Sequence, residues 1–228
     1  NWMNVVNGSG ITGAEDERIF INGNLTLANT MNNNFMGEIH MVGSGNFTIN
    51  TNGIQIRNAL FLNNSTGNWT LSNPLFVQRL VSFVAGGFNT GGYNLDLNRF
   101  ISESATARTL LLNNSQIYIR DRNFRAGEFY MLSDNLTLDA GTSHIIFGLG
   151  GTGVFNIYGA TSLRFYDVSY ENFQGNFYAS STVFPPVTYH FNNVSFKGEG
   201  YIAGDFRMQV LTLEGGNEYI PFDISSIY

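Results

Sequence analysis

Short apolar segments alternate with glycine- and asparagine-rich connections along most of the chain. Each segment has about four residues, is rich in aromatic and β-branched side chains, and is bounded by Gly, Asn or Ser, a pattern that is typical of β-strands. No window carries a sustained helical stripe of apolar residues with capping signals at its ends, so the sequence predicts an essentially all-β chain. The predicted strands of this kind are 18–21, 38–41, 59–62, 81–84, 109–112, 129–132, 144–147, 163–166 and 188–191.

A second segment, of the form Asn-apolar-Thr-apolar in its clearest copies, follows each of these strands. Its spacing is roughly 22 residues, inside the range that marks repeat architectures. Glycine directly precedes several copies, as at Gly23, Gly45, Gly67 and Gly175, which predicts a tight turn with positive φ before each strand. The copies begin at Asn24, Asn46, Asn68, Asn94, Gln116, Asn135, Asn156, Asn176 and Asn193.

Two short strands in a period of roughly 22 residues are typical of a right-handed parallel β-helix, a β-solenoid, because a β-propeller repeats at about 40 residues and a β-sandwich has no repeated motif. Stacked coils place equivalent side chains over one another. We therefore expect inward stacks of Phe, Leu and Ile. Asparagine is about 13% of the residues, well above ordinary usage, and we expect it to form an amide ladder with one asparagine in each coil.

The whole chain, 1–228, is predicted to be one solenoid domain, and we expect it to be a segment of a longer protein. Residues 1–16 are expected to form an edge or cap, 17–182 the regular coils and 183–228 irregular final coils, because Pro185 and Pro186 interrupt the period. The paired asparagines in Leu62–Ser65 and Leu112–Ser115, and the related Phe191–Val194, are predicted coil corners.

Charge and cysteine content exclude several classes of function. The chain has a net charge of −6 and a pI near 4.9, with Lys197 as its one lysine, so it lacks the basic surface that nucleic acids need. Mean hydropathy is −0.06 and there is no long apolar run, which argues against membrane insertion. The absence of cysteine removes disulfides, thiolate metal sites and thiol catalysis. No cofactor is predicted.

The densest charge cluster supplies the candidate binding residues, Arg120, Asp121, Arg122 and Arg125. Such charges on an outward face can bind acidic sugars, and the alternative is a polar connection whose charges pair with each other. The repeat places Arg120, Asp121 and Arg164 on neighbouring coils. Amides and hydroxyls on the same surface can hydrogen-bond sugar hydroxyls, and Trp69 or an exposed Tyr is expected to stack on a sugar ring.

Catalytic and metal motifs are not found in the sequence. Glycosidic hydrolysis needs paired carboxylates, whereas Asp121, Asp134, Asp139 and Asp167 are spread singly. There is no GxSxG motif. The histidines, His40, His144 and His190, lie in separate predicted strands, so no metal site is predicted.

Three blocks resemble the repeats of very large surface proteins of the Bacteroidetes group. The first runs from Phe88 through FNTGGYNLDL to the Arg108 segment RTLLLNNSQI, the second is FNNVSF at Phe191, and the third is QVLTLEGGNEY at Gln209. The resemblance covers about residues 17–220. It implies an adhesin-like, exported β-helix associated with type IX secretion and gliding motility, and it carries no catalytic residue. This chain has LNNS where those repeats have LGNS, and no C-terminal sorting domain is seen.

The leading hypothesis is a non-catalytic binding module of an adhesin-like protein at the bacterial cell surface. Its expected partners are glycans, other cell-surface molecules and further segments of the same long chain. The alternatives are a carbohydrate-active enzyme on the same fold, either a polysaccharide lyase or a glycoside hydrolase, and a phage tailspike or fibre module. A solenoid can serve any of these functions, so the fold alone does not decide among them.

Overall fold

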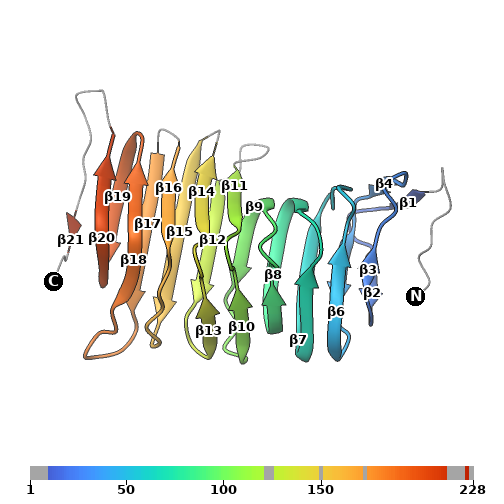
Figure 1. Cartoon of the computed structure of the whole chain (residues 1–228), viewed down its shortest axis with the longest axis horizontal. Coiled ribbons are helices and arrows are strands. Elements are labelled where there is room, and N and C mark those ends of the chain that lie inside the picture. Colours follow the sequence, from blue (N-terminus) through green and yellow to red (C-terminus); the bar gives the residue numbers. More distant parts are fainter. Residues whose placement is uncertain (1–9, 121–125, 149–150, 172–173, 215–223, 226–228) are drawn as a thin grey trace.

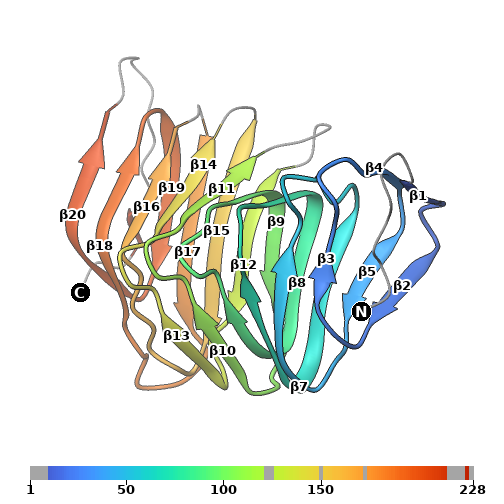
Figure 2. The same ribbon diagram turned by 45° about the vertical axis from the view of Figure 1, so that its right-hand side comes forward.

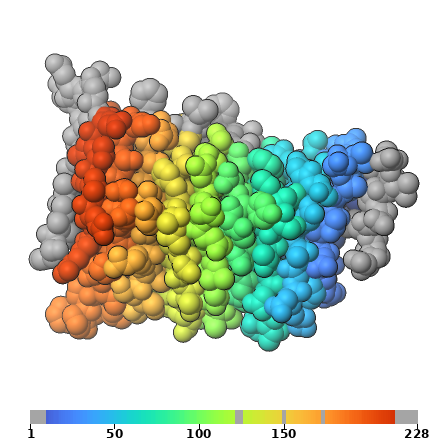
Figure 3. All heavy atoms as spheres, viewed as in Figure 1, coloured from blue at the N-terminus to red at the C-terminus, as the bar shows by residue number. Residues whose placement is uncertain are grey.

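The computed structural model describes residues 10–120, 126–148, 151–171, 174–214 and 224–225, and their only regular structure is β-strand. The strand pairings among these residues are parallel. The chain is a β-solenoid of about 8 turns with a spacing of ~22 residues, so the predicted fold class is confirmed. Its coils are stacked along the long axis of the molecule (Figure 1) and form successive bands across the surface (Figure 3).

Most strands are short, but β7 and β8, with 13 and 15 residues, continue through the corners of their coils. The strands are β1 (Gly10–Gly13), β2 (Arg18–Ile21), β3 (Leu25–Thr26), β4 (Asn32–Phe35), β5 (Glu38–Met41), β6 (Gly45–Asn50), β7 (Ala59–Leu71), β8 (Leu75–Asn89), β9 (Leu95–Ser102), β10 (Arg108–Leu111), β11 (Gln116–Arg120), β12 (Gly127–Leu132), β13 (Leu136–Asp139), β14 (His144–Gly148), β15 (Thr152–Gly159), β16 (Asp167–Tyr170), β17 (Gln174–Ser181), β18 (Tyr189–Phe196), β19 (Glu199–Gly204), β20 (Phe206–Leu213) and β21 (Ile224–Ser225).

The coils build three parallel ladders, which we call faces A, B and C (Figure 2). Face A holds β2, β5, β12, β15, β17 and β19 with parts of β7, β8 and β9. Face B holds β3, β6, β10 and β13, the ends of β7 and β8, residues 163–166, and the first halves of β18 and β20. Face C holds the first residues of β8 and β9, then β11, β14, β16 and the second halves of β18 and β20.

Aromatic stacks fill the space between the faces, as the period predicts. On face A, Phe100, Phe129, Phe155 and Phe177 are buried, and successive ring centroids lie 5.1, 5.4 and 5.0 Å apart. On face C, the ring of Tyr170 stacks between those of Phe147 and Phe196 at 4.6 and 4.4 Å. Alternate residues of each strand point outward, so the parallel register aligns their side chains in outward columns that run along the solenoid.

The asparagine excess has a different cause from the one the sequence suggests. None of the residues that begin the repeated motif is buried, and they fall on different faces, so they do not form a single amide ladder. Asparagines near the corners instead donate to backbone carbonyls one coil away. Asn58 Nδ2 donates to Met36 O at 2.8 Å, Asn64 Nδ2 to Val42 O at 2.7 Å and Asn98 Nδ2 to Arg120 O at 2.8 Å. Each amide serves backbone groups where the ladder is irregular.

The predicted corners are confirmed, although only one of them is a turn. Asn113, in the second LNNS segment, has a φ of 56° and lies in a turn. The first LNNS segment lies inside β7 where the strand passes from face A to face B and its register shifts after Leu62. Residues 191–194 lie where β18 passes from face B to face C, so both corners are crossed within a continuous strand. Gly45 has the predicted positive φ, 124°. At Gly67 the requirement for glycine is close packing, because a Cβ there would lie 2.5 Å from Gly43 O.

Arg108 is a buried cation that holds several coil corners together. Its side chain is 2% exposed on the inner side of β10. The guanidinium donates to the carbonyls of Ser102 at 2.6 Å, Thr106 at 3.1 Å, Leu132 at 2.8 Å and Asp134 at 2.8 Å. Burial lowers its pKa, an effect that nearby Asp134 opposes. Arg108 is therefore a structural residue.

Candidate functional site

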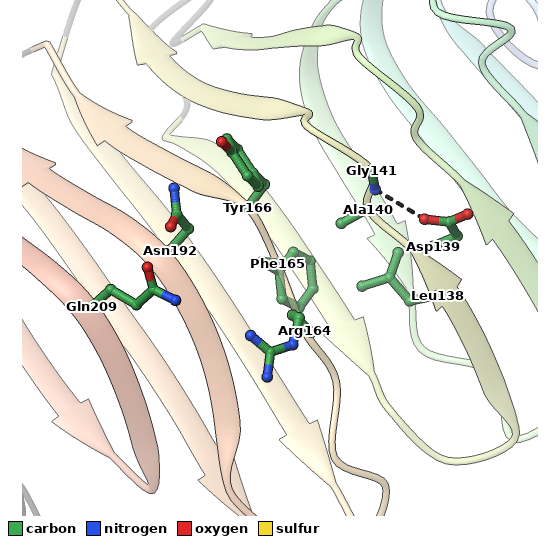
Figure 4. Close-up of a pocket in the computed structure, with 9 residues that line it drawn as sticks. All are labelled: Leu138, Asp139, Ala140, Gly141, Arg164, Phe165, Tyr166, Asn192 and Gln209. Atoms are coloured by element: carbon green, nitrogen blue, oxygen red, sulfur yellow. Dashed lines mark hydrogen bonds between the residues drawn. The ribbon is translucent and has the colours of Figure 1, made fainter.

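An open cleft lies on the outside of the solenoid. It has a volume of about 360 Å³ and lies between β13 with its following corner and the last coils of face B (Figure 4). Leu138 and Ala140 form one side, and polar side chains stand on the other. The lining residues are Leu138, Asp139, Ala140, Gly141, Arg164, Phe165, Tyr166, Asn192 and Gln209.

The cleft forms because the ladder of face B is interrupted. On one side, β13 pairs with β10, from Arg108↔Leu136 to Leu111↔Asp139. On the other side, residues 163–166 pair with β18 through Arg164 and His190. Among the described strand pairings, none joins β13 to 163–166. The side chains that border this gap therefore line an open space instead of packing into a continuous sheet surface.

The β13 side of the cleft is fixed by a glycine corner. Gly141 has a φ of 53°, and a Cβ at this position would lie 2.2 Å from Asn113 O, so only glycine fits without strain. The Gly141 N–H donates to Asp139 Oδ1 at 3.0 Å. This hydrogen bond holds the one carboxylate among the lining residues against its own turn.

The opposite side presents a regular grid of polar side chains. Tyr166, just before β16, and Asn192 and Gln209, on β18 and β20, follow one another on consecutive coils, since Phe191 pairs with Met208 and Asn192 N donates to Tyr166 O at 2.9 Å. Asn192 Nδ2 donates to Asp167 Oδ1 at 3.0 Å, which orients the amide beside the cleft. Tyr166 is 37% exposed, so its ring is accessible.

A second column beside the first is cationic. Arg164 pairs with His190, and His190 pairs with Arg207, so the three side chains occupy one outward column. The neighbours of His190 in sequence, Tyr189 and Phe191, are 0% and 2% exposed, which confirms that His190 faces outward. Burial lowers the pKa of His190, and the adjacent charges of Arg164 and Arg207 lower it further.

The residues predicted from sequence are placed elsewhere. Arg120 ends β11 on face C, where its Nε donates to Asp96 Oδ2 at 3.0 Å and its guanidinium lies 5.0 Å from the ring centroid of Tyr118. Asp121, Arg122 and Arg125 lie outside the described residues. Arg120 and Arg164 belong to different faces, so the expectation that they share a neighbourhood is wrong.

The prediction that Trp69 stacks on a sugar ring is also wrong. It lies in β7 and is 0% exposed, because its position in the strand alternation points inward, so it presents no surface for a sugar ring. Its indole Nε1 is buried and has no hydrogen-bond partner among the described residues. The expectation of an exposed tyrosine is met at Tyr166, and also at Tyr93, which is 39% exposed.

A histidine, a serine and an aspartate approach one another on face C. His144 Nε2 and Ser169 Oγ are 2.9 Å apart, and Asp167 lies opposite His144 in the ladder. Ser169 is only 3% exposed, however, and Asp167 Oδ1 accepts hydrogen bonds from Asn193 N and Nδ2 at 3.2 and 2.8 Å. Burial lowers the pKa of His144, an effect that Asp167 and Glu171 oppose. With the hydroxyl inaccessible, this group is structural.

Metal-binding clusters and membrane-spanning helices were sought among the described residues. No three His, Cys, Asp or Glu side chains gather there to hold a metal ion. Nothing in those residues forms a helix with the length and apolarity that a membrane crossing requires.

Comparisons with known proteins give no functional assignment. No family model, no curated protein and no solved structure matches the chain.

Sequence reasoning missed most of the cleft because the cleft depends on register. Arg164, His190 and Arg207 each stand alone in sequence, between apolar neighbours on both sides. That shared pattern of one cation between two inward apolar residues is the signal that could have identified the column, had the segments been aligned coil by coil.

Proposed function

We propose that the protein is a non-catalytic glycan-binding module of an exported, adhesin-like cell-surface protein, with the cleft of face B as its binding site. The observation that carries this proposal is the lining of the cleft: an accessible tyrosine ring, two amides and a guanidinium surround an open space of about 360 Å³. That volume lies in the range of small-molecule sites.

The chemistry of the lining suits sugars. A sugar ring has an apolar side made of C–H groups, which packs on an aromatic ring such as that of Tyr166, and hydroxyls that both donate and accept hydrogen bonds. Asn192 and Gln209 carry amides that also donate and accept. Because both residues are on strands of a packed solenoid, the ligand meets groups that are already ordered, which lowers the entropic cost of binding.

The solenoid itself supports an adhesive role. A stack of coils is a rigid, extended scaffold on which each coil contacts only its neighbours, and its side surface presents long rows of side chains. The outward columns are rich in amides, hydroxyls and tyrosines. We infer placement at the bacterial cell surface, with other segments of a longer chain as neighbours, from the same features and from the repeat resemblance.

A second candidate is a carbohydrate-active enzyme, favoured by the presence of Asp139 and Arg164 in one cleft. A carboxylate beside a cation can serve acid–base chemistry on a polysaccharide. Against this, hydrolysis by the usual mechanism requires two carboxyl groups that flank the scissile bond. Asp139 is the single carboxylate of the described lining, and one of its oxygens is already hydrogen-bonded to Gly141.

The proposal is tested by screening the protein against a glycan array and measuring the dissociation constant for the best ligands. Tyr166→Ala is expected to weaken binding about tenfold, which corresponds to one lost aromatic contact. Tyr93→Ala is the matched control, because Tyr93 is equally exposed but lies outside the cleft lining. We expect it to bind as the unmodified protein does.

Absence of any glycan ligand, or equal losses in both tyrosine variants, would contradict the binding proposal. The enzyme candidate is checked in the same samples by following new reducing ends and unsaturated uronates over time. If products accumulate with the unmodified protein and not with Asp139→Asn, the site is catalytic and the proposal of a binding module is wrong.

A further inference from the structure

We infer that the ligand of this module is an acidic glycan, whose carboxylate or sulfate groups are bound by the column Arg164, His190 and Arg207. The inference rests on the proposed function and specifies its ligand class. It is carried by the ladder register, which places three side chains capable of positive charge in one outward column on consecutive strands.

The column is positively charged, whereas the protein as a whole carries a negative net charge. The chain carries 11 Lys and Arg against 17 Asp and Glu, so three neighbouring basic side chains with no acid among them depart from its average. Several outward cations elsewhere are paired with acids on adjacent coils, as Arg18 is with Glu38 at 2.9 Å and Arg99 with Glu128 at 2.6 Å.

Arg164 and Arg207 lack such partners. Among the described residues no acidic side chain forms an ion pair with either of them, and both are exposed. Acids on flanking segments already accept other hydrogen bonds. Asp205 Oδ2 accepts from Ser181 N at 3.1 Å, and Asp139 Oδ1 accepts from Gly141 N at 3.0 Å. The guanidinium groups are therefore available to an anion from solution.

The guanidinium charges of Arg164 and Arg207 repel one another across His190, and this repulsion is relieved when an anion binds between them. A guanidinium also presents a planar fork of donors that matches carboxylate and sulfate oxygens. Adjacent strands are about 4.8 Å apart, so Arg164 and Arg207 are separated by about 10 Å along the column. A polymer with repeated acidic groups can contact both arginines at once, whereas a single small anion bridges only neighbouring members of the column.

The cation column and the cleft adjoin one another, so one ligand can contact both. Arg164 belongs both to the cation column and to the lining of the cleft, and Tyr166 lies two residues further along the same segment. Alternation along a strand brings both side chains to the outer surface. A chain of acidic sugars can therefore place its rings against Tyr166, Asn192 and Gln209 while its acidic groups contact the neighbouring column.

The test compares polymers that share a backbone and differ only in charge: polygalacturonate against its methyl ester, and dextran sulfate against dextran. We expect the acidic member of at least one pair to bind at least about tenfold more tightly. Arg164→Gln and Arg207→Gln are each expected to weaken that binding about tenfold, because each removes a charge-assisted hydrogen bond. Arg57→Gln, which removes an exposed arginine from another part of the solenoid, should change it less than about twofold.

Different outcomes separate this inference from the proposed function. Equal binding within both pairs, or an Arg57→Gln loss as large as that of Arg164→Gln, overturns the acidic-glycan inference and leaves glycan binding standing. Failure of all polymers in the panel and on the array contradicts the proposed function. In that case, anion binding by the column is still tested by titrating the protein with galacturonate and with inorganic sulfate and following the NMR resonances of the His190 ring. A shift that Arg164→Gln abolishes supports anion binding there, and no shift overturns it.

Discussion

Replacing Phe155 by alanine tests whether the stacked interior holds the solenoid together. Phe155 is 0% exposed, and its ring stacks between those of Phe129 and Phe177, with centroids at 5.4 and 5.0 Å. The rings of Phe165 and Phe191 meet it edge-on at 5.5 and 5.6 Å. Truncating a buried phenylalanine costs about 3–5 kcal/mol. We expect a loss in the upper half of this range. The neighbours in the stack, Phe129 and Phe177, cannot fill the cavity left by the truncation without losing their own ring contacts.

The assay is urea denaturation followed by circular dichroism, with Phe184→Ala as the matched control. Phe184 is 96% exposed, so the same truncation removes no packing and should change the free energy of unfolding by less than about 0.5 kcal/mol. Because solenoid coils contact only their neighbours, hydrogen exchange in the Phe155→Ala variant should rise first in the coils next to β15. A loss below about 1 kcal/mol, or one equal to that of Phe184→Ala, would refute the assignment of the stack as the main source of stability.

Two further predictions concern Arg108 and the two histidines whose pKa is lowered. Arg108→Met should lower the free energy of unfolding by at least about 3 kcal/mol, since it leaves several buried carbonyls without donors. Arg57→Met, at an exposed site, should be nearly neutral. Comparable urea midpoints for the two variants would contradict a structural role for Arg108. Folding lowers the pKa of His144 and of His190, in both mainly through burial, so below about pH 6.5 the unfolded chain binds more protons than the folded one. The free energy of unfolding should therefore be highest above about pH 6.5 and fall as the pH drops toward the folded-state pKa values. The double variant His144→Gln, His190→Gln should flatten the dependence of the melting temperature on pH between about 7.5 and 5.5, and an unchanged slope would show that other groups cause it.

The fold was predictable from sequence because its main determinant is local and repeated. The segments at Arg18, Glu38 and His144 are found as β2, β5 and β14, and in each an apolar residue points inward at every second position. The motif beginning at Asn46 and Asn68 is in register on face B. A period of roughly 22 residues with two such strands is compatible with few folds other than a solenoid.

The third face and the interior polar groups could not be predicted in the same way. Strand β8 contributes to all three faces. Gly86, with a φ of 86°, marks its bend toward face B, whereas no glycine or proline marks the earlier bend between Val77 and Leu80. Trp69 follows the same motif as Phe47, and its direction depends on strand alternation rather than on its preference for interfaces. Arginine is usually exposed, and only the register of β10 shows that Arg108 points into the interior.

The site was harder to predict than the fold because it is made of residues from different coils. Arg164, His190 and Arg207 become one column only through pairings that span about two coils, and a register error of one residue moves a side chain to the opposite side of the strand. The charge cluster that begins at Arg120 stands out in sequence, but at Arg120 the charge is paired with Asp96. Local charge density was therefore a poor guide to an available charge.

A crystal structure of the protein with a short acidic oligosaccharide, such as an oligogalacturonide, tests acidic-glycan binding in the cleft most directly. We expect a sugar ring against Tyr166, with the carboxylates of the oligosaccharide in contact with the guanidinium groups of Arg164 and Arg207. An oligosaccharide bound on face C beside Arg120, or a structure in which the cleft stays empty at saturating oligosaccharide, would contradict it.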